Sequence, residues 1–286
     1  MLLTKDEMAT EESSLRKEER KYVARLSSIS KRMKMIVRNE RSPDKAIASL
    51  YRFIESDAFK KTITTETGNI LIDVQNDRIR MFRKAASKSK GGKTSISKTT
   101  VKKSEMAEVR SKALAQAVID AKNSFKSAVE TLDAYSKVQQ SLDRIGKDII
   151  SNMVDRIENV VGYRLRLLAR HEIANASNGF DRLMSNKIGS GLYVWTCIHD
   201  DRTRTAHNKM DGVLCAWNDA PNPEQLFGGY DTNHGYHPGG TYNCRCTAIP
   251  VISNRDIVFP IRFHKGGNIV VIRNYWAFRW ALFRNR

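Results

Sequence analysis

Apolar residues in the first two thirds of the chain recur every three or four positions, which is the period of an amphipathic helix. Charged residues fill most of the remaining positions, so each predicted helix has one apolar face. Five stretches follow this pattern, at residues 5–40, 43–54, 69–82, 104–161 and 163–187. Pro43 is well placed to open the second stretch, because proline is tolerated in the first turn of a helix.

The longest apolar stripe lies between Ser104 and Val161 and contains no proline. A single helix of this length would span about 85 Å at roughly 1.5 Å per residue. Gly146 offers one place to bend it, and Gly162 separates it from the next helix. We therefore expect a long, kinked helix that packs against another helix or subunit, with a long antiparallel hairpin as the alternative.

The pattern changes after residue 188, where Gly, Pro, Asn and Tyr become frequent and short alternating runs predict strands at 192–196 and 247–252. Two β-rich runs flank residues 265–268, which are typical of a hairpin turn. The aromatic and arginine-rich end, residues 275–286, is expected to form a helix that docks its aromatic side on a neighbour. The predicted fold class is α+β, with mainly helical N-terminal two thirds that include a long helix, followed by a small loop-rich α+β C-terminal module.

These changes in pattern predict five segments along the chain. They are an N-terminal helical segment (1–82), a basic flexible linker (83–103), the long helix and the helix after it (104–188), a Cys/His-rich module (189–252), and a β-hairpin with an aromatic basic tail (253–286).

The net charge points to a polyanionic partner. Lys and Arg outnumber Asp and Glu by 49 to 31, for a formal charge of +18, and double-stranded DNA bound without sequence preference is the expected polyanion. The linker carries basic residues and no acid, which suits a phosphate backbone, although a solvated linker is the alternative. The candidate DNA-binding residues are Lys84, Lys88, Lys90, Lys93, Lys98, Lys102 and Lys103. The acidic, polar N-terminus argues against a secretory signal, and no run is apolar enough for a membrane span.

All four cysteines and four of the six histidines lie between Trp195 and Pro250. Zinc accepts cysteine and histidine in tetrahedral sets and can stabilise a loop-rich module with a small core. The ligands that we expect are His207, His237, Cys244 and Cys246, with Cys197, Cys215 and His234 in reserve.

A metal-free module is the alternative to a zinc site. In that case Asp200 or Asp201 would pair with Arg204 or Arg245, while the cysteines would pack as small buried apolar groups. A disulfide is a third option, although it is disfavoured in a reducing cytosol.

The order of residues in this module resembles the C-terminal domain of the phage minor head proteins, the head morphogenesis family that includes the F protein of phage Mu. The resemblance covers roughly residues 165–252 and rests on a tryptophan, then Asp-Arg-Thr-Arg-x-x-His, then glycine, then a late Asn-Cys-Arg-Cys. It implies a structural role for Trp195, Asp201, Arg202, Arg204, His207, Gly212, Asn243, Cys244, Arg245 and Cys246. The match departs from the family at His171, which stands where the family's Arg-Thr-Glu-like signature has threonine.

The resemblance implies a structural protein with no enzymatic activity, which would associate with the phage portal and other head proteins during head assembly and contact packaged DNA. Such a protein would be found in the virion, and in the host cytoplasm during assembly. The apolar helical stripe also suggests self-association. The alternative from another class is a virion-associated metal-dependent nuclease or other hydrolase, for which Asp201, His207, Asn208, His234 and His237 are suitable metal ligands.

Overall fold

The computed structural model describes residues 5–89, 101–142, 145–229, 234–241 and 243–283. Long helices come first and a small mixed sheet follows, so the α+β class predicted from the sequence is confirmed. The helices are α1 Lys5–Arg38, α2 Pro43–Ile54, α3 Asp57–Lys88, α4 Lys103–Ser141, α5 Gly146–Lys187, α6 Thr205–Met210, α7 Pro223–Phe227 and α8 Tyr275–Phe283. The strands are β1 Leu192–Thr196, β2 Leu214–Ala216, β3 Thr247–Pro250, β4 Ile261–Lys265 and β5 Asn268–Ile272.

The chain forms two compact units. A helical unit comprises Arg16–Asp73 and Arg110–Ile173, and a sheet unit comprises Met1–Leu15, Val74–Val109 and Ala174–Arg286. Because α1, α3, α4 and α5 each supply residues to both units, neither unit corresponds to one uninterrupted stretch of sequence.

The helical unit is built on the apolar stripes that the sequence predicts. Phe59 of α3 meets Phe125 of α4 edge-to-face, with ring centroids 5.3 Å apart. Leu132, in the middle of the longest stripe, is completely buried. The helices of this unit therefore cover much of that stripe, and an uncovered part lies where α4 ends and α5 begins, because Val138, Leu142 and Ile145 are more than half exposed there.

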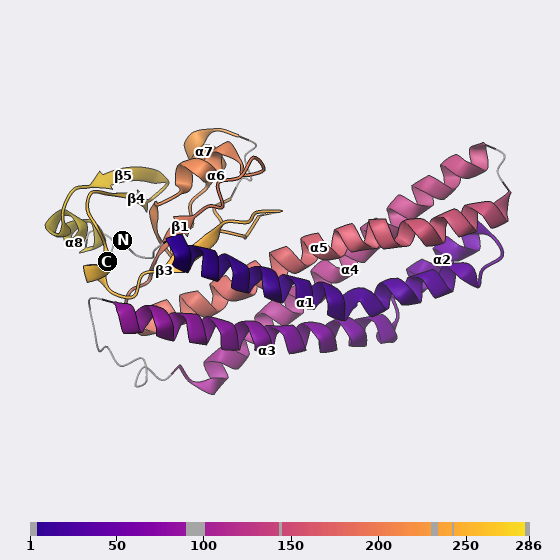
Figure 1. The fold of residues 1–286 in the computed structure, drawn as a ribbon, viewed down its shortest axis with the longest axis horizontal. Helices are drawn as coiled ribbons and strands as arrows, with labels where there is room; N and C mark the ends of the chain where they lie inside the picture. Colours follow the sequence, from indigo (N-terminus) through magenta and orange to yellow (C-terminus); the bar gives the residue numbers. More distant parts are fainter. Residues whose placement is uncertain (1–4, 90–100, 143–144, 230–233, 242, 284–286) are drawn as a thin grey trace. The chain divides into compact units, whose positions relative to one another are not determined.

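The expected long helix between residues 104 and 161 is wrong. α4 ends at Ser141 and α5 begins at Gly146, and the two run antiparallel in the helical unit (Figure 1), with the Arg156 guanidinium 4.0 Å from the centre of the Tyr135 ring. A hairpin pairs the apolar faces of the two helices with each other, which one long helix could not do.

Two further boundaries also differ from the prediction. Gly162 lies inside α5 and ends no helix, because packing of the apolar residues on both sides outweighs the cost of about 1 kcal/mol for a helical glycine. α3 is longer than the predicted 69–82 and extends to Lys88, so the first residues of the expected linker 83–103 are helical. The predicted division of the chain into five domains or segments stays a prediction.

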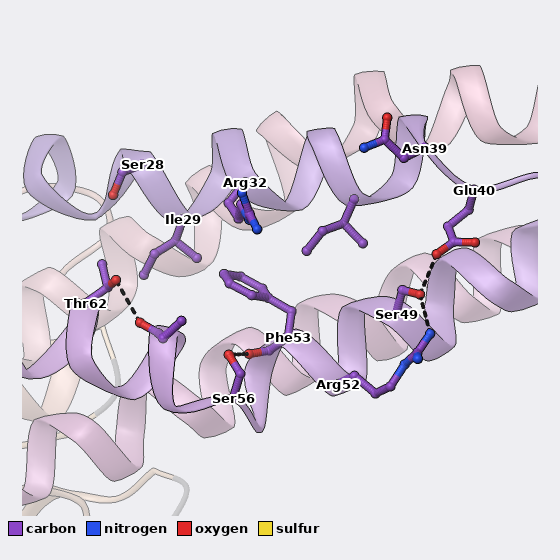
Figure 2. Close-up of a pocket in the computed structure, with 12 residues that line it drawn as sticks. Ser28, Ile29, Arg32, Asn39, Glu40, Ser49, Arg52, Phe53, Ser56 and Thr62 are labelled. Carbon is purple, nitrogen blue, oxygen red and sulfur yellow. Dashed lines mark hydrogen bonds between the residues drawn. The ribbon is translucent and has the colours of Figure 1, made fainter.

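An open groove of about 710 Å³ lies among α1, α2 and α3 of the helical unit (Figure 2). Apolar side chains such as Ile29 and Phe53 line part of it. At its rim, the Ser49 hydroxyl donates to the Glu40 carboxylate at 2.6 Å and accepts from Arg52 at 2.8 Å. These rim groups satisfy one another, so we assign the groove no chemistry.

The sheet unit holds one five-stranded mixed sheet in the order β3-β1-β2-β4-β5. β1 pairs antiparallel with both β2 and β3, β2 pairs parallel with β4, and β4 pairs antiparallel with β5. The predicted strand at 192–196 and the hairpin around 265–268 are confirmed, and the predicted strand at 247–252 is shorter, ending at Pro250. β4 and β5 belong to the same sheet as β1, β2 and β3, so the predicted boundary between residues 252 and 253 does not separate two sheets.

Each face of the sheet carries an apolar cluster, because successive side chains of a strand point to opposite faces. Tyr193 and Trp195 lie in one apolar cluster with the four cysteines, and Leu192 lies in the other with Phe278 of α8. The chain end therefore forms the expected helix and packs Phe278 inward, but Trp276 and Trp280 are 74% and 63% exposed. The module thus has a larger core than its loop-rich sequence suggests.

A buried ion pair joins α3 to α5 within the sheet unit. Arg78 contacts Asp181 through two nitrogens, with Nε at 3.0 Å from Oδ1 and Nη2 at 2.7 Å from Oδ2. Both side chains are almost fully buried. Removal of one partner from such a pair typically costs about 3–5 kcal/mol, because the other charge is left buried, so this contact defines how the two helices meet.

In the helical unit, Glu172 of α5 is buried beside another carboxyl group. Burial and the neighbouring Asp120 raise the pKa of Glu172 to about 9. His171, whose pKa burial lowers, and the buried Tyr22 also face this group. Glu172 is therefore protonated at neutral pH and shares a hydrogen bond with Asp120.

This arrangement predicts that the helical unit loses stability as pH rises. The folded state retains a proton on Glu172 that the unfolded chain releases above its ordinary pKa of 4.5, so the free energy of unfolding should fall between about pH 4.5 and 9. The slope is about 1.4 kcal/mol per pH unit at most. Glu172→Gln should remove the slope and stabilise the protein at pH 8, as measured by urea unfolding at several pH values.

Glu158→Gln is the matched control, because Glu158 lies on the same helix with its side chain 76% exposed. It should leave the pH slope of the natural chain in place. An unchanged slope in Glu172→Gln would show that Glu172 is ionised at neutral pH.

Candidate functional site

The predicted Cys/His cluster exists, and His207 lies at its centre. The helix α6 holds this histidine with its side chain almost completely buried. Its Nδ1 lies 3.4 Å from Cys244 Sγ and 3.5 Å from Cys246 Sγ. Its Nε2 lies 2.8 Å from the Tyr236 hydroxyl and 3.2 Å from Glu224 Oε1.

The side chains of Glu224 and Tyr236 determine which ring nitrogen of His207 carries the proton. The Tyr236 hydroxyl donates its proton to Glu224 Oε2 at 2.6 Å, and burial with this neighbouring carboxylate raises the pKa of Tyr236. The same hydroxyl must then accept from His207, so the histidine proton is on Nε2 and the Nδ1 lone pair faces the thiols. The sequence does not predict the roles of Glu224 and Tyr236, because no motif or spacing distinguishes them from other polar residues of the module.

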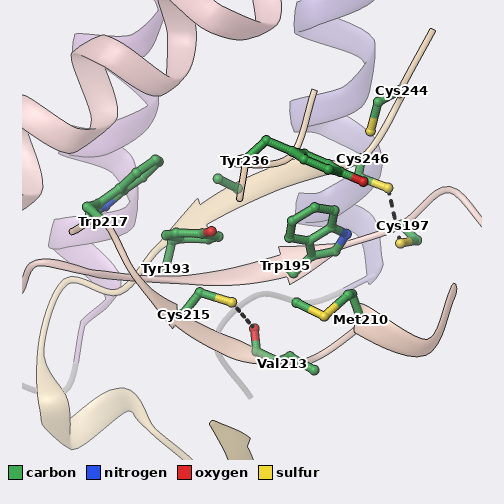
Figure 3. Packing of buried hydrophobic residues seen from close by; sticks show 11 residues of the cluster. Tyr193, Trp195, Cys197, Met210, Val213, Cys215, Trp217, Tyr236, Cys244 and Cys246 are labelled. Carbon is green, nitrogen blue, oxygen red and sulfur yellow. Dashed lines mark hydrogen bonds between the residues drawn. The ribbon is translucent and has the colours of Figure 1, made fainter. Parts of the chain in front are cut away.

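A third thiol completes the cluster. Cys197, at the end of β1, places its Sγ 3.2 Å from Cys246 Sγ (Figure 3). The adjacent Cys246 thiol and burial raise the pKa of Cys244, and the adjacent Cys197 thiol contributes most to raising the pKa of Cys246. A raised pKa keeps a thiol protonated, and a protonated thiol is a poor nucleophile.

One ion pair ties the two halves of the motif together. Arg245, between Cys244 and Cys246, binds both carboxylate oxygens of Asp200. The Thr203 hydroxyl also donates to Asp200 at 3.0 Å. Arg245, with a smaller contribution from Thr203, holds the pKa of Asp200 well below its usual range. The polar pairing that the sequence offered as the alternative to a metal site is therefore present, in the form of Asp200 with Arg245.

The other motif residues divide into supporting and exposed groups. Trp195 is completely buried and meets the His207 ring edge-to-face, with ring centroids 5.7 Å apart. Gly212 has a positive φ of 74° and donates its N–H to the Trp195 carbonyl at 2.9 Å, a conformation that favours glycine. Asn243 also has a positive φ, 57°, at the turn before the two cysteines.

The roles expected of the charged motif residues need correction. Asp201 and Arg202 are exposed, and Asp200 makes the partly buried ion pair with Arg245 in place of Asp201. Arg204 instead approaches Glu224, with Nη1 3.8 Å from Oε1. The structure selects Asp200 because its position in the turn before Thr203 directs its carboxylate toward Arg245.

His237, one of the zinc ligands expected from the sequence, does not join the other three. Its Nδ1 lies 3.0 Å from the Tyr193 hydroxyl, and its ring packs on Trp217. Burial, with a smaller effect of Arg182, lowers the pKa of His237 to about 4. Of the reserve ligands, Cys197 joins the cluster, whereas the Cys215 thiol donates to Val213 and His234 is exposed.

Four of the candidate DNA-binding lysines lie within the described residues. Lys84 and Lys88 are exposed near the end of α3, and Lys102 and Lys103 are exposed at the start of α4. The remaining candidates, Lys90, Lys93 and Lys98, lie outside the described residues.

The geometry gives little support to the predicted nuclease ligands. Within the residues that the structure describes, metal-type side chains gather only as His207 with Cys244 and Cys246, and as Asp120 with His171 and Glu172. The hollow beside His207 has a volume of about 60 Å³. Pockets for small molecules are typically about 300–1,000 Å³, so this hollow is much smaller than such a pocket.

Comparison with known proteins agrees with the motif. Residues 123–249 match the family model described as Phage Mu protein F like protein. The resemblance predicted from the sequence is thereby confirmed, and the match supports a phage head-related protein. The matched region runs from α4 to β3 and so includes all the cluster residues.

A curated relative from Haemophilus influenzae, described as an uncharacterized protein, is 26% identical over 121 residues, which is 42% of this chain. The chain covers only 24% of the length of that relative. No solved structure matches the chain. Among the described residues, none of the helices combines the length and the apolar character that a bilayer crossing requires.

The ion pair between Asp200 and Arg245 predicts a difference between two arginines of the same motif. Arg245→Ala should lower the melting temperature of the protein by several degrees, because Asp200 and the turn around it lose their main partner. Arg202→Ala should have almost no effect, since its side chain is 86% exposed. Thermal unfolding of the two variants by circular dichroism compares them directly, and equal melting temperatures would contradict a structural role for Arg245.

Proposed function

We propose that this protein is a structural minor head protein of a tailed phage or prophage, which acts in head morphogenesis by association with the portal and other head proteins. The observation that carries this proposal is the family match over residues 123–249, in which Trp195, Cys244 and Cys246 of the family motif lie in one buried apolar cluster. It would act without turnover, in the virion and in the host cytoplasm during assembly.

The geometry around His207 supports a binding role over a catalytic one. His207 contacts Cys244 through Nδ1 and Glu224 through Nε2. The same order of thiol, imidazole and carboxylate serves as nucleophile, base and orienting group in thiol hydrolases. However, the thiol is 5% exposed and its pKa is raised, and the adjoining hollow is much smaller than a typical small-molecule pocket. These features favour a structural use of the same residues.

The basic residues at the ends of α3 and α4 support contact with packaged DNA. Exposed lysines on both sides of an acid-free stretch can neutralise phosphates and release counterions. We propose that this region binds double-stranded DNA without sequence preference.

If this region binds DNA, the affinity for duplex DNA should fall as the salt concentration rises, and the four described lysines should account for part of that fall. Replacing Lys84, Lys88, Lys102 and Lys103 with glutamine should weaken binding to duplex DNA and reduce the slope of log affinity against log salt by up to about 3–4. Fluorescence anisotropy with two unrelated duplexes at several salt concentrations measures this slope.

The control replaces four other exposed lysines, Lys31, Lys45, Lys60 and Lys61, with glutamine. Both variants lose the same charge, so equal losses of slope would indicate a general effect of charge and no local DNA site.

Association with phage heads can be tested at the exposed apolar residues between α4 and α5. Leu142 and Ile145 are 61% and 70% exposed, whereas Leu132 is buried and its replacement would disrupt the fold. Leu142→Ser with Ile145→Ser should abolish co-purification with phage heads or portal while leaving the helical content unchanged. Ile119→Ser, at a site on α4 that is 54% exposed, is the control and should co-purify normally.

The rival function is tested on the same material. A folded, monomeric protein that hydrolyses DNA or a virion component, and loses this activity in His207→Asn, would replace the structural proposal with an enzymatic one.

A further inference from the structure

Four potential metal ligands converge inside the sheet unit from three separate parts of the chain. Cys197 comes from the end of β1, His207 from α6, and Cys244 and Cys246 from the segment before β3. The ligand atoms of His207, Cys244 and Cys246 all lie within 4.8 Å of one another. Cys197 Sγ lies 3.2 Å from Cys246 Sγ and supplies the fourth.

The distances resemble the edges of a zinc tetrahedron. Bonds of about 2.3 Å to sulfur and 2.0–2.1 Å to nitrogen give edges of about 3.8 Å between sulfurs and about 3.5 Å between sulfur and nitrogen. His207 Nδ1 is 3.4 Å and 3.5 Å from the sulfurs of Cys244 and Cys246. Cys197 Sγ lies outside the set of ligand atoms that are all within 4.8 Å of one another, and its 3.2 Å contact with Cys246 Sγ is shorter than such an edge. Metal binding therefore requires the Cys197 sulfur to move until it lies one edge length from each of the other three ligand atoms.

The spacing of one residue between Cys244 and Cys246 is compatible with this geometry. Their contacts alternate along the backbone, since both cysteines face His207 while the intervening Arg245 faces Asp200. One short segment therefore provides two ligands on one side and an ion-pair anchor on the other.

The surrounding groups orient these ligands as a metal site requires. Tyr236 and Glu224 hold the proton of His207 on Nε2, which leaves the Nδ1 lone pair directed at the thiols. Histidine ligands of zinc commonly donate their other ring nitrogen to such a carboxylate. The Gly239 N–H also donates to Cys244 Sγ at 3.3 Å, which would stabilise a thiolate.

We propose that Cys197, His207, Cys244 and Cys246 hold one structural zinc ion. This set replaces the His237 expected from the sequence with Cys197. Binding is a ligand exchange without redox change, in which each cysteine forms a zinc–sulfur bond and loses its thiol proton to solvent. Three thiolates and one imidazole leave no open position on a tetrahedral ion, so the site stabilises the loops of the module and performs no catalysis.

The test is the zinc content of the full-length protein, purified under reducing conditions from cells grown with added zinc. Elemental analysis should find about one zinc per chain. Cys197→Ser, Cys244→Ser, Cys246→Ser and His207→Asn should each lower zinc affinity by more than about 100-fold, measured by competition with a chromogenic chelator. Glu224→Gln should lower it about 10–100-fold, because it loosens the orientation of His207.

Cys215→Ser and His237→Asn are the matched controls. Cys215 is a fully buried cysteine of the same apolar cluster, and His237 is a half-buried histidine of the same module, but neither faces His207. Both variants should retain a full zinc content. Zinc loss in the controls equal to that in the ligand variants would mean that misfolding, and no specific ligand, causes the loss.

Cobalt provides a readout that does not depend on folding of the serine variants. Replacing zinc with Co²⁺ in the natural chain should give a sulfur-to-cobalt charge-transfer band, whose intensity rises with the number of thiolates. Three thiolates would support the proposal, whereas two would exclude Cys197. A protein that takes up neither metal, or that contains a Cys197–Cys246 disulfide after purification under reducing conditions, would overturn it. The zinc site does not depend on the proposed head role, since each is measured separately.

Discussion

The sheet unit depends on one physical constraint, which is that long loops must be held by contacts between side chains. The strands β1, β2 and β3 have five, three and four residues, and the connections between them are longer than the strands themselves. Strand hydrogen bonds alone cannot order such connections. His207 contacts side chains from the loop before β3 and from the segment around α7, so the position of one imidazole determines the path of both.

The ion pair between Arg245 and Asp200 reinforces this centre from the outside. It joins the segment between the two cysteines to the turn that leads into α6, where Thr203 also holds the carboxylate. The two halves of the family motif, far apart in sequence, are therefore a single set of contacts. This gives a physical reason for the joint appearance of Asp-Arg-Thr-Arg-x-x-His and Asn-Cys-Arg-Cys in one chain.

The helical unit is held together differently, by apolar faces that meet along α1 to α5. Among its buried polar groups, Tyr22 and Thr67 share a 2.7 Å hydrogen bond. Glu172 is neutral beside Asp120, which removes the cost of burying two like charges. Long helices with a small exposed apolar end are suited to association with other proteins, in agreement with a phage head-related protein.

Much of this fold follows from the sequence alone. Hydrophobic periodicity and local turn chemistry predicted the helix opened by Pro43, the strand at 192–196, the hairpin around 265–268 and the C-terminal helix, because these depend on neighbouring residues. The crowding of cysteine and histidine also indicated the right module. Tertiary structure decided the rest. The α4–α5 hairpin and the helical conformation of Gly162 depend on packing against residues distant in sequence. The same is true of the ion pair that Asp200 makes in place of Asp201. It also holds for the cluster, where Cys197 lies near Cys246 and His237 contacts Tyr193. Periodicity describes which face a residue occupies, whereas ion pairs and ligand sets depend on which faces meet in space.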